Sequence, residues 1–177
     1  MAKVVVVLSG PVSAGKTTLA ERLVADYGAL HYRTRLLLET RAKGRVALER
    51  TAMQEFGEAL DEDTEGRWVA EDLVPQINCL GPTAIVVIDA VRISEQVDAL
   101  RAGLPRQVIH VHLDASRSVL EARYRRRRRS RVAEKATYAE VLANPTESRV
   151  PELADDADVV IDTALSTKRD VEVRAAS

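Results

Sequence analysis

Residues 10–17 read Gly10-Pro11-Val12-Ser13-Ala14-Gly15-Lys16-Thr17, which fits the pattern G-x-x-x-x-G-K-[ST] of the Walker A motif. This pattern indicates a phosphate-binding loop when it lies between a strand and a helix. Residues 3–9 form an apolar, β-branched run that predicts a strand buried on both faces. Residues 15–27 carry apolar side chains at helical spacing. The flanking segments therefore support the motif.

The residue types of this loop suit the binding of an anion. Gly10 and Gly15 allow the backbone to turn tightly and to approach a phosphate closely. Backbone N–H groups and the positive end of the following helix would surround that phosphate. Lys16 would reach the β- and γ-phosphates of a nucleotide, and the Thr17 hydroxyl would bind Mg²⁺, which prefers oxygen ligands. The candidate phosphate-binding residues are Gly10, Ser13, Ala14, Gly15, Lys16, Thr17 and Thr18.

The composition is typical of a soluble globular protein. The chain has 177 residues, 46% of them hydrophobic and 30% charged, which fits a single domain. Its net charge of −1 gives no general electrostatic reason for a nucleic-acid or membrane partner. No run approaches the roughly 20 apolar residues that span a bilayer, and the start lacks a signal-peptide layout, so we expect a cytoplasmic protein. The single Cys79 excludes an internal disulfide.

Strand-like and helix-like segments alternate along the chain, which predicts an α/β fold with a parallel sheet of about five strands flanked by helices. The predicted strands cover residues 3–9, 29–32, 83–89, 108–114 and 158–162. The predicted helices cover residues 15–27, 46–60, 67–80, 94–102 and 116–129. We interpret residues 61–66 as an acidic turn. In such sheets ligands bind beyond the carboxyl ends of the strands.

Several polar residues fall at that predicted edge. Asp89 follows the apolar run 85–88, where an acid can hold Mg²⁺ or orient an acceptor. Arg92 follows shortly after and could bind a second phosphate bidentately, although a solvated loop arginine is the alternative. Arg35 follows the second strand and could bind the phosphate of an acceptor. Gln54 could hydrogen-bond a base from a neighbouring helix, unless it is simply exposed.

An arginine run at residues 125–129 has two interpretations. Five consecutive arginines point all round a helix, so only some of them can face one ligand. Arg123 and Arg127 share a helical face, with Arg126 adjacent. Over the phosphate loop they would neutralise charge on a transferring phosphoryl group. The alternative is a solvated or nucleic-acid-binding face, which the near-zero net charge and scarce aromatic residues disfavour.

Taken together, these features resemble the P-loop nucleoside and nucleotide kinases over about residues 3–162, closest to bacteriophage-type deoxynucleoside monophosphate kinases and adenylate kinase-like proteins. The resemblance is carried by the Walker A loop, the segment at Arg35, the pattern Arg50-x-x-x-Gln54-x-x-Gly57, Asp89-x-x-Arg92 and the arginine-rich segment. It implies a three-layer P-loop NTPase fold in one domain over residues 1–177, with an acceptor-binding helical segment at 33–80 and a lid-like segment at 115–150. The chain departs from adenylate kinases at Asp89-Ala90-Val91-Arg92, where they carry Asp-Gly-Phe-Pro-Arg.

The resemblance also implies roles for individual residues. ATP would bind the loop, and Mg²⁺ would be held by Thr17 and Asp89. The catalytic residues would be Lys16, Asp89, Arg123 and Arg127. The acceptor would be bound by Arg35, Gln54, Arg92 and Arg126.

We therefore predict an ATP-dependent phosphotransferase that converts a (deoxy)nucleoside monophosphate and ATP into the diphosphate and ADP by direct in-line transfer. The alternatives are dephospho-coenzyme A kinase or another small-metabolite kinase, a polynucleotide 5′-kinase that uses the arginine run, and an NTP-binding regulatory module. We expect a small-molecule partner, a monomer or homodimer, and neither membrane nor nucleic-acid binding.

Overall fold

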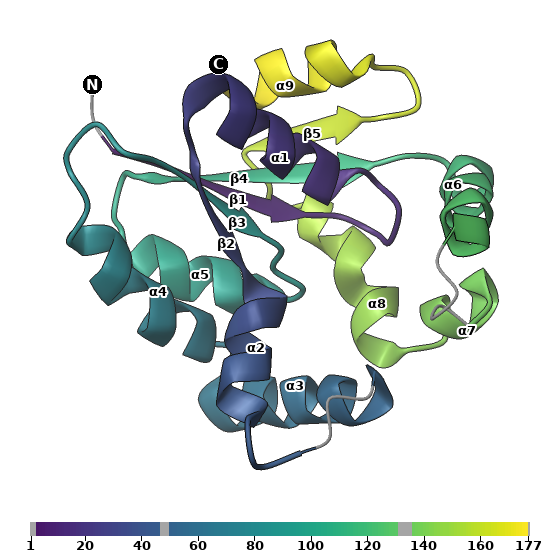
Figure 1. The fold of residues 1–177 in the computed structure, drawn as a ribbon, viewed down its shortest axis with the longest axis horizontal. Helices are drawn as coiled ribbons and strands as arrows, with labels where there is room; N and C mark the ends of the chain where they lie inside the picture. The colour runs from purple at the N-terminus through teal and green to yellow at the C-terminus, as the bar shows by residue number, and fades with distance from the viewer. Residues whose placement is uncertain (1–2, 47–49, 131–135, 177) are drawn as a thin grey trace.

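Five parallel strands form the central sheet of the computed structural model, which describes residues 3–46, 50–130 and 136–176 (Figure 1). The strands are β1 (Val4–Ser9), β2 (Leu30–Arg33), β3 (Ile85–Asp89), β4 (Val108–Asp114) and β5 (Val159–Asp162). Their order across the sheet is β2-β3-β1-β4-β5, and every neighbouring pair is parallel. The predicted α/β fold with a five-stranded parallel sheet is confirmed.

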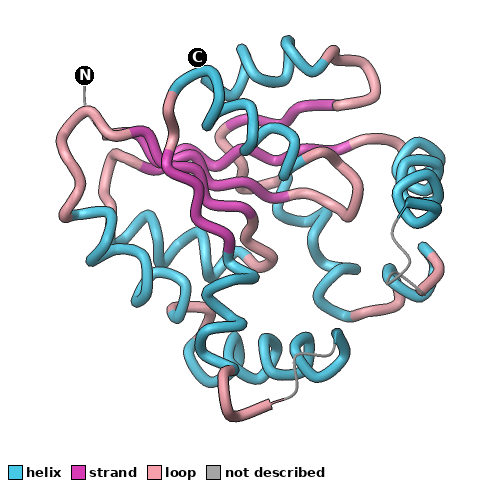
Figure 2. The backbone as a smooth tube through the Cα atoms, viewed as in Figure 1, coloured by secondary structure: helices cyan, strands magenta, loops and turns pink. Residues whose placement is uncertain are grey.

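Helices cover both faces of the sheet, with α1 and α9 on one side and α4 and α5 on the other (Figures 1 and 2). The helices of the described ranges are α1 (Lys16–Tyr27), α2 (Thr34–Ala42), α3 (Arg50–Thr64), α4 (Trp68–Asn78), α5 (Ser94–Gly103), α6 (Arg117–Ser130), α7 (Tyr138–Leu142), α8 (Pro145–Arg149), the 3₁₀ helix η1 (Val150–Ala154) and α9 (Lys168–Ala176). Within those ranges, none of the helices has the length and apolarity needed to cross a membrane.

Side chains of β1 alternate between two apolar cores, because successive side chains of a strand point to opposite faces of the sheet. Val6 and Leu8 pack in the core beneath α1, together with Leu19 and Leu23. Val5 and Val7 pack in the core beneath α4 and α5. Burial on both faces explains why the strand reads as a continuous apolar run.

Helix α3 extends further than its sequence suggested. The predicted acidic turn at residues 61–66 is wrong for its first four residues, which complete α3. The chain leaves the helix at Glu65 and Gly66, both of which have positive φ. Tertiary contacts support the extra turn, because Asp61 accepts hydrogen bonds from residues of α4 and α5. The predicted helix at 46–60 is observed from residue 50, and residues 47–49 lie outside the described ranges.

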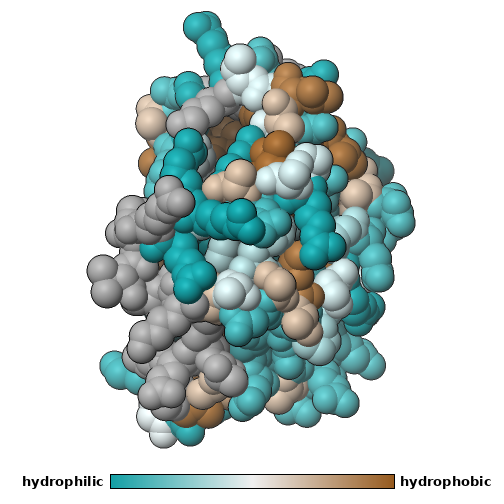
Figure 3. All heavy atoms as spheres, turned by 90° about the vertical axis from the view of Figure 1, so that its right-hand side faces the viewer, coloured by the Kyte–Doolittle hydropathy of each residue, from teal (hydrophilic) through white to brown (hydrophobic). Residues whose placement is uncertain are grey.

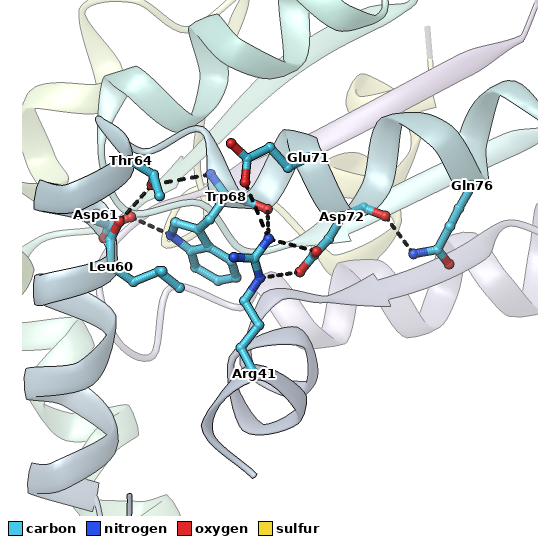
Figure 4. A network of polar contacts seen from close by, with 8 residues as sticks. All are labelled: Arg41, Leu60, Asp61, Thr64, Trp68, Glu71, Asp72 and Gln76. Atoms are coloured by element: carbon cyan, nitrogen blue, oxygen red, sulfur yellow. Dashed lines mark hydrogen bonds and ion pairs between the residues drawn. The ribbon is translucent and has the colours of Figure 1, made fainter. Parts of the chain in front are cut away.

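Arg41 fixes α2 against α4 (Figure 4). Its Nε and Nη2 atoms donate to the two carboxylate oxygens of Asp72, each at 2.8 Å. The guanidinium also lies over the Trp68 ring, 5.8 Å from its centroid. A bidentate pair with a cation–π contact defines one orientation of α2 against α4, and α2 begins directly after β2, at the carboxyl ends of the strands.

Candidate active site

The Walker A loop connects β1 to α1, and two of its glycines are required by its geometry. Gly10 has a φ of 135°, and a Cβ atom at this position would lie 2.1 Å from the carbonyl oxygen of Leu113. Gly15 has a φ of 106°, a backbone conformation that side-chain-bearing residues rarely adopt. The loop therefore passes closely over the end of β4 before it enters α1.

Lys16 lies over this loop. Its Nζ donates to the carbonyl oxygens of Gly10 at 2.5 Å and Pro11 at 3.0 Å. Burial lowers the pKa of Lys16 to about 8, and the carboxylates of Glu147 and Asp89 partly oppose that shift. The pKa of this ammonium is therefore sensitive to any further negative charge in the loop.

A buried polar cluster lies beneath the loop at the ends of β1 and β4. The Ser9 hydroxyl bonds to His110 Nε2 at 2.7 Å and to His112 Nδ1 at 2.8 Å. Burial lowers the pKa of His112 to about 4, so this ring is neutral at neutral pH. The cluster links the two strands at the residue before Gly10, which fixes where the loop begins.

Thr17 and Asp89 meet in front of the loop, from α1 and the end of β3. Thr17 Oγ1 donates to Asp89 Oδ2 at 3.0 Å. Hydroxyl and carboxylate oxygens suit Mg²⁺, and the described residues contain no larger His, Cys, Asp or Glu cluster for a metal. This pair would therefore share Mg²⁺ with phosphate oxygens and water. His31 Nε2 lies 3.6 Å from the same carboxylate, and burial lowers the pKa of His31.

A cleft of about 1170 Å³ runs from the loop to α2, α3, α6 and α8. The predicted site residues that line it are Ser13, Ala14, Gly15, Lys16, Thr17, Thr18, Arg35, Gln54, Arg92, Arg123, Arg126 and Arg127. Gly10 and Asp89 do not line the cleft directly. Gly10 packs against Leu113 of β4, and Asp89 contacts the cleft-lining Thr17. The structure therefore brings the predicted residues to one place, while their individual roles stay predictions.

Both arginines predicted to bind an acceptor phosphate have carboxylate partners. Arg35 is 84% exposed in its side chain, and its Nε donates to Glu39 Oε1 at 2.8 Å. Arg92 Nη1 donates to Glu147 Oε1 at 2.7 Å, and the Glu147 carboxylate is buried. An acceptor phosphate would therefore have to share or displace a carboxylate at each of these guanidinium groups.

Helix α6 places Arg123, Arg126 and Arg127 along the cleft, on a side of the molecule where hydrophilic side chains predominate (Figure 3). Arg123 donates to Thr163 twice, from Nη1 to the hydroxyl and from Nη2 to the carbonyl oxygen, each at 2.8 Å. The Arg127 guanidinium lies 5.3 Å from the centroid of the Tyr124 ring. Arg126 is exposed at the rim. Arg123 is thus fixed to the segment after β5, whereas Arg126 extends towards solvent.

Five carboxylates that line the cleft were missed from the sequence: Glu21, Glu39, Glu58, Asp61 and Glu147. Glu147 lies in α8, whose Asn144 side chain accepts a hydrogen bond from the Glu147 N–H at 3.0 Å. The Asn144-Pro145 pair is a recognisable helix-start signal and could have located this helix. Only the folded chain shows that Glu147, 7% exposed, lies close enough to Lys16 to raise its pKa.

Comparison with protein-family models gives no match for this sequence, and comparison with curated proteins gives none either. Solved structures do match. A tunicamycin resistance protein from Deinococcus radiodurans aligns with a TM-score of 0.65 and 20% identity, covering 98% of this chain and 94% of its own. A shikimate kinase from Aquifex aeolicus vf5 aligns with a TM-score of 0.59 and 15% identity, covering 96% of this chain and 92% of its own. A gluconokinase from Sinorhizobium meliloti 1021 aligns with a TM-score of 0.56 and 16% identity, covering 98% of this chain and 89% of its own. The chain therefore has the fold of the P-loop kinases.

Proposed function

We propose that this protein is a kinase that transfers the γ-phosphoryl group of ATP to a small molecule bound in the same cleft. The observation that carries the proposal is that Lys16 and Thr17 line one continuous cleft, with the Asp89 carboxylate bonded to Thr17. Lys16 provides positive charge above the loop, and Thr17 with Asp89 provides two oxygen ligands for Mg²⁺. The similar folds of a shikimate kinase and a gluconokinase support this class of reaction.

The dimensions of the cleft support two ligands. Its volume of about 1170 Å³ is larger than the roughly 300–1,000 Å³ of a typical single-ligand pocket. Beyond the Thr17–Asp89 pair it continues between α2, α3 and α8, where an acceptor would lie in line with the γ-phosphate. A closed cleft would keep water from competing with that acceptor.

The residues of the loop and of α6 would stabilise the transferring group. Bound Mg²⁺ would neutralise phosphate charge at the Thr17–Asp89 pair. Lys16 would stabilise the negative charge on the β- and γ-phosphates. Arg123 and Arg127 would contact the phosphates of ATP from the side of α6. No covalent enzyme intermediate is needed, because positioning and charge neutralisation provide the catalysis.

A nucleoside monophosphate is the second candidate acceptor. Arg35, Arg92 and Gln54 all line the acceptor side of the cleft, as that substrate requires. The carboxylate partners of the two arginines weaken this candidate, because an incoming phosphate would have to compete with Glu39 and Glu147. The reaction class does not depend on this choice.

The proposal can be tested without knowing the acceptor. Release of ADP from Mg·ATP is measured with and without a deproteinised pool of small cellular metabolites, and ³²P from the γ-position is followed into organic products. We expect the pool to accelerate ADP release and to take up the label. Lys16→Ala should abolish both effects, while Lys43→Ala, in an exposed turn, should retain them. Label that appears only in inorganic phosphate would refute the kinase proposal.

A further inference from the structure

We propose that the acceptor is an uncharged, hydroxyl-bearing molecule, and that Asp61 receives the proton of its reacting hydroxyl; this inference rests on the kinase function proposed above. Carboxylates outnumber cationic side chains in the acceptor half of the cleft. The donor half is lined by Lys16, Arg123, Arg126 and Arg127. The acceptor half is lined by Glu39, Glu58, Asp61 and Glu147, and its two arginines are already bonded to carboxylates, Arg35 to Glu39 and Arg92 to Glu147.

The carboxylates of the acceptor half are held in place. Glu58 Oε1 accepts hydrogen bonds from Asn144 Nδ2 at 2.8 Å and from Thr146 Oγ1 at 3.1 Å. Glu147 is nine-tenths buried and bonded to Arg92. Neither carboxylate can turn away without breaking these contacts. A phosphate or carboxylate on the acceptor would therefore enter beside the Glu58 carboxylate, which is held only by neutral donors, while Arg92 is already paired with Glu147, and this is unfavourable in a partly desolvated site.

Asp61 is the carboxylate best placed to interact with an acceptor hydroxyl. Its Oδ1 accepts hydrogen bonds from Trp68 Nε1 at 2.6 Å and from Gln96 Nε2 at 2.8 Å (Figure 4 shows the Trp68 contact). Its Oδ2 has no hydrogen-bond partner among the described residues. One oxygen thus fixes the orientation of the carboxylate, and the other is available to a ligand. Burial raises the pKa of Asp61, which suits a general base better than a fully solvated carboxylate.

The proposed step balances as an ordinary phosphoryl transfer. The acceptor oxygen forms a bond to the γ-phosphorus of ATP as the bond between that phosphorus and the β,γ-bridging oxygen breaks. The hydroxyl proton passes to Asp61 Oδ2 and then to solvent. The products are ADP, the phosphate monoester and one proton.

The charge of the acceptor can be tested by fractionating the metabolite pool. The pool is passed through an anion-exchange resin at neutral pH, and each fraction is assayed for ³²P uptake from γ-labelled ATP. We expect the flow-through to contain the acceptor and the labelled product to bind the resin. Activity found only in the retained fraction would overturn this inference and leave the kinase proposal standing. Activity in neither fraction would contradict both this inference and the kinase proposal.

Matched compounds provide a second measurement. Nucleosides and their 5′-monophosphates share a skeleton and differ in charge, so competition by each against the active fraction isolates the effect of the phosphate. We expect the nucleosides to inhibit at lower concentration than the monophosphates. Stronger inhibition by the monophosphates, or their conversion to diphosphates, would contradict the inference.

The role of Asp61 is tested by variants with a pH readout. Asp61→Asn should lower kcat by about 10²-fold or more and remove the acidic limb of the pH–rate profile. Glu62→Gln, at the exposed neighbouring residue, should change neither.

Trp68→Phe keeps an aromatic ring, although a smaller one, and removes a hydrogen bond that lowers the pKa of Asp61. It should shift the acidic limb to higher pH. An unshifted limb in this variant, with the full limb retained in Asp61→Asn, would exclude Asp61 as the base.

Discussion

Thr17 and Asp89 are 72 residues apart in the sequence, yet the Thr17 hydroxyl donates to the Asp89 carboxylate at 3.0 Å. The contact follows from the sheet order, because β1 and β3 are parallel neighbours and Leu8 of β1 pairs with Asp89 at the end of β3. Thr17, the second residue of α1, is thus placed beside an acid from the neighbouring strand. Two oxygen ligands suited to Mg²⁺ meet where a nucleotide would bind.

Replacing Asp89 should affect the dependence on Mg²⁺ in particular. Asp89→Asn keeps the shape of the side chain but removes its charge, so we expect the Mg²⁺ concentration for half-maximal ADP release to rise by about 10-fold or more. Nucleotide binding without Mg²⁺ should change much less. Asp98→Asn, at an exposed residue of α5, is the matched control. An unchanged Mg²⁺ requirement in Asp89→Asn would show that this carboxylate is not part of the metal site.

Gly10 should tolerate no side chain. The added Cβ of Gly10→Ala would meet the Leu113 carbonyl oxygen at 2.1 Å, and its φ of 135° is strained for alanine. We expect the free energy of unfolding in urea to fall by at least about 2 kcal/mol. Gly81→Ala is the control, because that Cβ would meet nothing within 4 Å, and it should change stability by about 0.5 kcal/mol or less. Equal stabilities for the two variants would mean that the loop does not pack on β4 as described.

Nucleotide binding should be coupled to protonation of Lys16. The pKa of this lysine is about 8 because of burial, and nearby phosphate charge would raise it. Near pH 8 we therefore expect an uptake of about half a proton per bound ATP, falling towards zero as the pH is lowered and Lys16 is already protonated. Calorimetry in buffers with different ionisation enthalpies measures this uptake. Lys16→Arg stays charged at every pH of the experiment and should take up no proton at this side chain. Identical proton uptake by the wild type and this variant would show that another group takes up the proton.

The Arg41–Asp72 pair should contribute to stability through its geometry. Arg41→Lys keeps the charge but cannot form both 2.8 Å bonds to Asp72, so we expect the free energy of unfolding to fall by about 1 kcal/mol. Arg35→Lys replaces the arginine of the exposed pair with Glu39 and should have almost no effect on stability. Similar losses in both variants would indicate that bidentate bonding is unimportant here.

The central part of the fold could be predicted because local sequence and tertiary structure agree there. Residues 4–8 before Gly10 are all apolar because β1 is buried on both faces. Gly10 and Gly15 stand where the following loop requires positive φ. The strand ending at Asp89 was recognisable for the same reason. Parallel strands then bring Thr17 and Asp89 to one edge without any further information.

The acceptor half could not be predicted in the same way, because it depends on how α3 and α8 fold over the strand ends. Asp61 lies in an acidic stretch that resembles a turn, and only its bonds to Trp68 and Gln96 reveal a helical residue facing a cleft. Arg92 was recognised as a phosphate-binding candidate, but no local pattern indicates its pairing with Glu147, 55 residues away.

In the function proposed here, the loop at residues 10–17 binds the triphosphate of ATP, and the acceptor lies in the adjoining part of the cleft. The most direct measurement is a crystal structure with Mg²⁺ and a non-hydrolysable ATP analogue. We predict that backbone N–H groups between Ser13 and Thr17 contact the β-phosphate, that Mg²⁺ lies between Thr17 and Asp89, and that the γ-phosphate points towards Asp61. An analogue bound elsewhere, with the loop empty, would contradict the account.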